Sequence, residues 1–70
     1  MIYTPENSKG LRLMRANGKV IKFAYYFDDE TGMTWFYDTE ERNGATVLKL
    51  KDGVPIKKWD VLKDARMVKL

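Results

Sequence analysis

The carboxylates of Asp28, Asp29 and Glu30 have the spacing that comes closest to acid–base or metal chemistry in this chain. Neighbouring carboxylates act as general acid and base only where burial or a fixed separation tunes them. Here a threonine and a glycine follow, so we expect the run at the solvated tip of a hairpin. It also lacks the alternating ligands of a calcium-binding loop. We therefore predict a turn over residues 28–32, without a catalytic or metal-binding role.

Groups for covalent catalysis are scarce. The chain contains no cysteine and no histidine, so a nucleophile would have to be Ser8, a threonine or a lysine beside a base. Ser8 lies in residues 1–9, which we expect to form a weakly structured arm. The same composition excludes disulfides and ordinary zinc sites, and no glycine-rich loop precedes a helix to hold a phosphate. We predict that the protein is not an enzyme and that it binds neither a cofactor nor a small-molecule substrate.

Length and charge restrict the class of protein further. Seventy residues form one domain, near the lower limit at which a single core sustains a fold. The net charge of +3 is unevenly spread, because residues 1–27 and 42–70 are basic and residues 28–41 are acidic. No apolar run is long enough to cross a membrane, and the first residues lack the basic region of a signal peptide. We expect a cytoplasmic protein without a membrane partner.

Four turn signals organise the middle of the chain, at residues 16–18, 28–32, 40–44 and 51–53. The stretches between them alternate between apolar and polar residues, most clearly at residues 19–27, which are rich in β-branched and aromatic side chains. This pattern is typical of antiparallel strands joined by short turns. It predicts a β-meander over residues 10–58.

Turn chemistry then predicts which strand residues face each other. A five-residue loop at residues 28–32 places Phe27 opposite Met33. At residues 16–18 we favour a three-residue loop with Gly18 in the left-handed conformation over a two-residue turn. The reason is that a slip of one residue would turn the whole apolar set of that hairpin to the other face.

Two further loops extend this register. A four-residue loop at residues 40–43 places Trp35 opposite Leu48, and a three-residue loop at residues 51–53 places Leu48 opposite Ile56. All four turns then agree on one apolar inner face. Its members are Leu11, Leu13, Ile21, Phe23, Tyr25, Phe27, Met33, Trp35, Tyr37, Leu48, Leu50, Val54 and Ile56.

The last residues read differently. Residues 59–65 predict a short helical turn with Asp60 as its N-cap, and residues 66–70 predict a closing strand that pairs near the first strand. The predicted fold is all-β: a five- or six-stranded antiparallel meander forming an SH3-like or half-open barrel, with one short C-terminal helical turn. An open meander capped by that helix is the alternative. The likeness to SH3-like barrels concerns strand order and length, and carries no function.

The same register predicts an apolar outer patch surrounded by lysines. Three interpretations stay open: the arm or the C-terminal helix covers the patch, a protein partner or a second copy binds it, or single-stranded nucleic acid stacks on it. We expect Trp59, which follows Lys57 and Lys58, to plug the end of the barrel rather than to stack on a base. The predicted patch consists of Lys22, Tyr26, Phe36, Val47, Lys49 and Lys57.

Two segments resemble small uncharacterised single-domain proteins encoded by phages and prophages. They are Pro5-Glu6-Asn7-Ser8-Lys9-Gly10-Leu11 and Phe27-Asp28-Asp29-Glu30-Thr31-Gly32. The resemblance covers less than a quarter of the chain, transfers no site residues, and implies an accessory protein that binds host or viral proteins. We therefore expect a non-enzymatic accessory binding module with a protein interface, self-association included, on its outer sheet face. A nucleic-acid-binding β-barrel with a lysine-rimmed aromatic face is the alternative.

Overall fold

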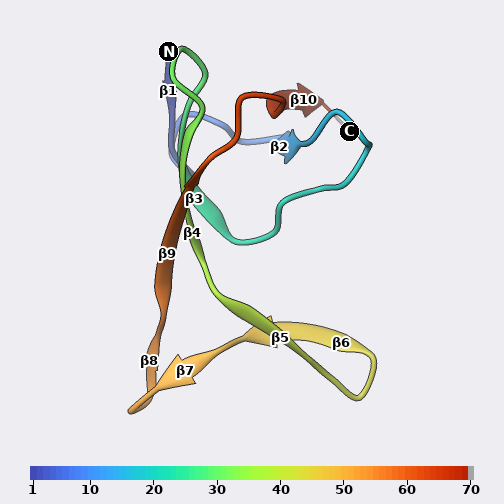
Figure 1. The fold of residues 1–70 in the computed structure, drawn as a ribbon, viewed down its shortest axis with the longest axis vertical. Coiled ribbons are helices and arrows are strands. Elements are labelled where there is room, and N and C mark those ends of the chain that lie inside the picture. The colour runs from blue at the N-terminus through green and yellow to red at the C-terminus, as the bar shows by residue number, and fades with distance from the viewer. Residues whose placement is uncertain (70) are drawn as a thin grey trace.

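The computed structural model describes residues 1–69 of the chain (Figure 1). Their regular secondary structure consists of antiparallel strands, without a helix. The all-β prediction is therefore confirmed. The central sheet has the strand order β1 (Ile2–Tyr3), β3 (Ala24–Asp28), β4 (Met33–Tyr37) and β9 (Lys57–Val61). Three two-stranded sheets accompany it: β2 (Leu11–Met14) with β10 (Arg66–Lys69), β5 (Thr39–Arg42) with β6 (Ala45–Leu48), and β7 (Leu50–Lys51) with β8 (Val54–Pro55).

A closed triangle of backbone hydrogen bonds joins the central sheet to two outlying hairpins. The N–H of Asp38 donates to the carbonyl of Ile56 (2.8 Å), and the N–H of Lys49 donates to the carbonyl of Asp38 (2.9 Å). The N–H of Ile56 donates to the carbonyl of Lys49 (3.2 Å) and completes the triangle. These three residues lie between β4 and β5, between β6 and β7, and between β8 and β9. Each uses both of its backbone groups, so the hairpins can diverge, as Figure 1 shows, without losing a hydrogen bond.

Both outlying hairpins end in turns tighter than the sequence analysis predicted. Asn43 and Gly44 join β5 to β6, and Asp52 and Gly53 join β7 to β8. All four residues have positive φ, between 51° and 79°, as two-residue type I′ turns require. The predicted loops of four and three residues are therefore wrong. As a consequence Leu48 pairs with Thr39 within its own hairpin instead of lying opposite Trp35.

The first hairpin follows its predicted register. Met14 bridges to Val20, the N–H of Ile21 donates to the carbonyl of Leu13 (2.9 Å), and Gly18 has a φ of +86°. The expected strand at residues 19–27 nevertheless breaks before Ala24. Phe23, the residue at the break, has a φ of 62° and is 43 % exposed, an uncommon conformation for an aromatic residue.

A β-bulge at Tyr25 changes the predicted pairing of β3 with β4. Ala24 lies opposite Phe36, as predicted, but Phe27 lies opposite Thr34 instead of Met33. The hairpin tip explains this shift of one residue. Asp28 accepts two hydrogen bonds from the loop. The N–H of Gly32 donates to its backbone carbonyl (2.8 Å), and the N–H of Glu30 donates to its carboxylate (3.0 Å). The loop is therefore one residue shorter than predicted.

The core lies between one face of the central sheet and the β2–β10 strand pair. Leu13, Phe27 and Leu62 are its buried apolar side chains among the described residues. Thr34, which is not among the residues predicted for the inner face, is fully buried, and its hydroxyl donates to the carbonyl of Gly32 (3.0 Å). Of the predicted inner face only Leu13 and Phe27 are fully buried. The bulge redirects Met33, Trp35 and Tyr37, and the two tight turns redirect Leu48 and Leu50.

The predicted helical turn at residues 59–65 is wrong. Trp59 lies within β9, and the chain then turns at Leu62, whose carbonyl accepts the N–H of Ala65 (3.2 Å). Trp59 consequently plugs no barrel end and is 57 % exposed. β10 pairs antiparallel with β2, which is the pairing expected of the last strand. The sheets do not close into the predicted SH3-like barrel, and Leu70, the end of the expected closing strand, lies outside the described residues.

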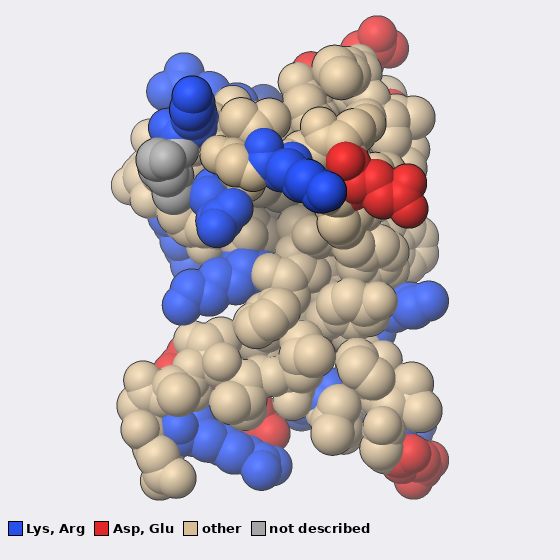
Figure 2. Space-filling view, turned by 180° about the vertical axis from the view of Figure 1, so that it is seen from behind, with Lys and Arg blue, Asp and Glu red and all other residues tan. Residues whose placement is uncertain are grey.

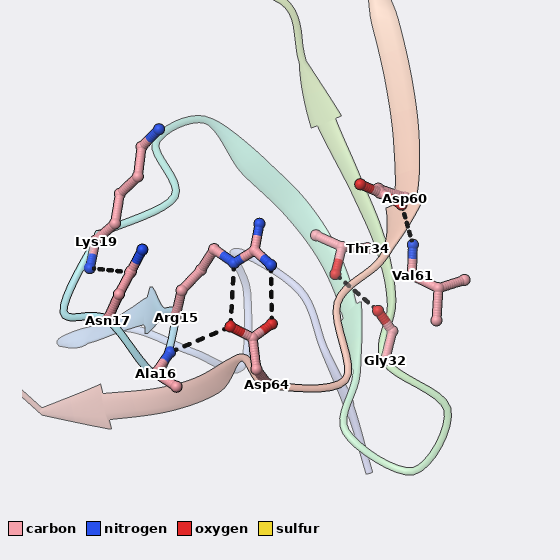
Figure 3. Close-up of polar contacts among 9 residues, drawn as sticks. All are labelled: Arg15, Ala16, Asn17, Lys19, Gly32, Thr34, Asp60, Val61 and Asp64. Atoms are coloured by element: carbon pink, nitrogen blue, oxygen red, sulfur yellow. Dashed lines mark hydrogen bonds and ion pairs between the residues drawn. The ribbon is translucent and has the colours of Figure 1, made fainter.

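An ion pair fastens the first hairpin loop to this C-terminal turn (Figure 3). Arg15 binds both carboxylate oxygens of Asp64, through Nε (3.2 Å) and Nη2 (3.1 Å), and the N–H of Ala16 approaches the same carboxylate (3.4 Å). These hydrogen bonds lower the pKa of the Asp64 carboxyl. Lys58 lowers the pKa of Asp38 in the same way, through an ion pair of 3.2 Å.

Residues 1–69 include no helix long and apolar enough to cross a membrane.

Acidification is expected to reduce the free energy of unfolding through Asp38 and Asp64. Both carboxyls have a lower pKa in the folded chain, so their contribution is complete above the unfolded pKa of about 4 and is lost as the pH falls through the folded values. Urea unfolding between pH 7 and pH 2 measures this loss. The D38N/D64N double variant should lose less stability over that range, and an unchanged pH dependence would contradict the assignment.

Gly32 is expected to be the glycine least tolerant of alanine. It has a φ of +83°, and a Cβ there would lie 3.0 Å from the carbonyl carbon of Leu62, whose N–H also donates to the Gly32 carbonyl (2.7 Å). Gly18, at a φ of +86° with open space around it, is the matched control. We expect Gly18→Ala to cost about 1 kcal/mol and Gly32→Ala about 1 to 3 kcal/mol more. Equal losses in chemical denaturation would show that the close approach to Leu62 is not limiting.

Candidate interaction surface

The outer face of the central sheet carries large aromatic side chains in cross-strand rows. Tyr26, Trp35 and Trp59 lie opposite one another on β3, β4 and β9. The rings of the two tryptophans are 6.3 Å apart between centroids and tilted by 42°. Met33 and Val61 form the next row. We call these five residues the aromatic face.

Alternation along β4 explains why this face is directed away from the core. Thr34 points inward and is fully buried, so its neighbours Met33 and Trp35 point to the opposite side. All five residues of β9 are exposed, with Trp59 at 57 % and Val61 at 42 %. Trp59 and Val61 therefore face solvent, while Tyr26, Met33 and Trp35 are half-buried.

Few charges accompany the aromatic face. The row beyond the tryptophans pairs Tyr37 with Lys57, and the ring of Tyr25 lies 4.8 Å from that of Tyr37. Lys58 points to the opposite side, where it binds Asp38. In Figure 2 uncharged side chains cover the middle of the view, and Lys and Arg side chains lie mostly toward one side. Of the two lysines of β9, Lys57 therefore lies beside the aromatic face and Lys58 lies on the other side of the sheet.

The structure disperses the predicted patch. The bulge at Tyr25 turns Tyr26 to the aromatic face, whereas Phe36 lies on the opposite side of the sheet, in the row of Ala24 and Lys58. Phe36 does stay close to Lys22, because both line a hollow of about 490 Å³. The other three members separate: Val47 lies opposite Glu40 in the β5–β6 hairpin, Lys49 lies at the backbone triangle, and Lys57 lies beside the aromatic face.

Sequence reasoning missed Trp35, Trp59 and Val61 as surface residues. A usable signal was present in residues 57–61, where Trp59 and Val61 alternate with Lys58 and Asp60 as in a strand with one apolar face. The assignment of Asp60 as a helix N-cap concealed that alternation. The prediction of Trp35 as an inner residue failed for a different reason, since the bulge at Tyr25 has no local signature in the sequence.

Ser8 and Asp29, two residues that the sequence analysis considered for catalysis, are engaged in hydrogen bonds. The hydroxyl of Ser8 donates to the carbonyl of Thr4, and the carboxylate of Asp29 accepts a hydrogen bond from the amino group of Met1 (2.7 Å). Within residues 1–69 no three carboxylates gather into a cluster that could hold a metal ion. A hollow of about 520 Å³ lies between the arm, β2 and β3, and its walls include Tyr3, Leu11 and Phe27.

No protein-family model, curated protein or solved structure matches the chain. The candidate surface is therefore supported by its geometry: an exposed tryptophan on an edge strand, next to a second tryptophan.

The two tryptophans are expected to differ in their access to solvent. In the Trp35→Phe variant the remaining fluorescence comes from Trp59, and acrylamide should quench it strongly. In the Trp59→Phe variant the half-buried Trp35 remains, and the quenching constant should be smaller by about twofold or more. Stern–Volmer plots of both variants, before and after urea unfolding, measure the difference. A reversed order would contradict the placement of the aromatic face.

Proposed function

We propose that this chain is a small non-enzymatic binding module that contacts a protein through its aromatic face. The observation that carries the proposal is the exposure of Trp59, on an edge strand beside Trp35. Tryptophan is enriched among the residues that dominate binding energy at protein interfaces. A contiguous apolar area on a soluble domain commonly marks such an interface.

The composition of the aromatic face supports a protein as its partner. Interface centres are depleted in charged residues. On the side of β9 that belongs to the aromatic face, Lys57 is charged, whereas Trp59 and Val61 are apolar. The core is thin, with three buried apolar side chains in residues 1–69, so a partner would also add to stability. The proposal extends to an accessory role of the phage or prophage type in the cytoplasm, in keeping with a chain free of cysteine.

Site-specific photocrosslinking tests the proposed interface. A benzophenone amino acid replaces Trp59 in one variant and Leu50 in another. Leu50 is the matched control, because it is equally exposed (55 %) and apolar but lies on β7, away from the aromatic face. Irradiation of the purified chain, and of cells that express it, should give discrete protein adducts from position 59 and not from position 50. Equal adduct formation at both positions, or none at either, would refute the proposal.

Nucleic acid is the second candidate ligand, favoured by the position of Lys57 on the same side of β9 as the exposed ring of Trp59. A base stacked on that ring would quench its emission, and phosphate contacts would weaken steeply with salt. Titration with a thymidine oligonucleotide at 50 and 200 mM salt tests nucleic acid against protein as the ligand. Quenching whose fitted affinity is at least tenfold weaker at the higher salt concentration supports nucleic acid as the ligand. Unchanged emission at both salt concentrations rejects it.

A further inference from the structure

The outer edge of β9 has backbone groups directed away from the sheet. Hydrogen bonds between Gly32 and Leu62 and between Asp38 and Ile56 bracket the β4–β9 ladder. Because hydrogen-bonded pairs alternate along an antiparallel ladder, the even-numbered residues of β9 bond to β4. The N–H and C=O groups of Lys57, Trp59 and Val61 therefore point to the open edge. β9 is the last strand of the central sheet, so this edge is a template for a further strand.

We propose that a second copy of this chain pairs with this edge, β9 against β9 in antiparallel orientation, about a two-fold axis at Trp59. The inference deepens the proposed function, on which it rests, by naming the protein that the aromatic face contacts. An interface of this kind is self-complementary, since each copy contributes the same strand. It continues the central sheet of one copy into that of the other, and it places the two Trp59 rings in adjacent positions on a shared aromatic face.

Charge selects this register among the neighbouring ones. With Trp59 opposite Trp59, Lys58 of each copy lies opposite Asp60 of the other, and the ion pair forms twice. A shift of the symmetry axis by one residue places Lys58 opposite Lys58 or Asp60 opposite Asp60. Like charges directly opposite each other destabilise a strand pair. Lys58 and Asp60 would also form the pairs without hydrogen bonds, in which opposing side chains approach most closely.

Asp60 protects this edge in the single chain. Its carboxylate accepts a hydrogen bond from the N–H of Val61 at 2.8 Å, which satisfies one of the outward backbone donors (Figure 3). On pairing, the N–H of Val61 donates instead to the carbonyl of Lys57 in the second copy, and the carboxylate of Asp60 turns to Lys58. The ammonium group of Lys58 has three donors, so it can keep Asp38 while it binds the second carboxylate.

Charge reversal tests the pairing and its register together. The K58D variant places a carboxylate opposite Asp60 of the other copy, and the D60K variant places an ammonium group opposite Lys58. Each variant alone should therefore associate at least tenfold more weakly than the wild-type chain. Mixed in equal amounts, the two variants should form a heterodimer, because every opposing pair then has opposite charges. Sedimentation velocity over micromolar to millimolar concentrations measures the association, and circular dichroism checks the fold of each variant.

A second variant separates edge pairing from any effect of K58D on its ion pair with Asp38. Methylation of the Trp59 backbone nitrogen, in a chemically assembled chain, removes one outward donor and leaves every side chain and the β4–β9 ladder in place. It should abolish dimerisation. A dimer of the methylated chain as tight as that of the wild type, or a mixture of K58D and D60K that stays monomeric, would overturn the inference.

A monomeric wild-type chain at all concentrations would also overturn it, and the crosslinking result then separates the two proposals. If benzophenone at position 59 still gives an adduct with a different protein, the proposed function stands and the self-pairing fails. If position 59 gives no adduct, both fail.

Discussion

The arrangement of this protein depends on three residues that close a triangle of backbone hydrogen bonds. Asp38, Lys49 and Ile56 each donate and accept within it, so the chain leaves the central sheet after β4, forms two hairpins and returns as β9. Since the triangle uses main-chain groups, it depends on the lengths of the two hairpins more than on side-chain packing. Those lengths follow from the two type I′ turns, and they bring Trp59 back opposite Trp35.

Competition between the two faces of the central sheet explains where the aromatic residues lie. The bulge at Tyr25 and the tip around Asp28 direct Phe27 and Thr34 toward the β2–β10 strand pair. The neighbouring residues, Trp35 among them, must then point outward because side chains alternate along a strand. A chain of this size cannot cover both faces of the central sheet. Association that buries the aromatic face would therefore be stabilising, because it removes apolar surface from water.

Local turn chemistry made part of the fold predictable. Alternation between glycine-containing turns indicates an all-β chain, and the register of the first hairpin follows from the cost of exposing its apolar residues. The outlying hairpins were mispredicted because their loop lengths were chosen to extend one continuous inner face, whereas Asn43-Gly44 and Asp52-Gly53 form two-residue turns. The predicted patch failed with that face, since Tyr26 and Phe36 share a side only in a strand without a bulge.

By itself the sequence determined that the chain is built from strands and where its turns lie, because these depend on contacts between neighbouring residues and on φ angles that glycine permits. Only the tertiary structure decided which face of the central sheet is buried. Two long-range contacts make that choice: the close approach of Gly32 to Leu62, and the packing of Leu13 and Phe27 in one core. Alternation specifies that a strand has two faces, but the burial of one of them depends on segments distant in the chain.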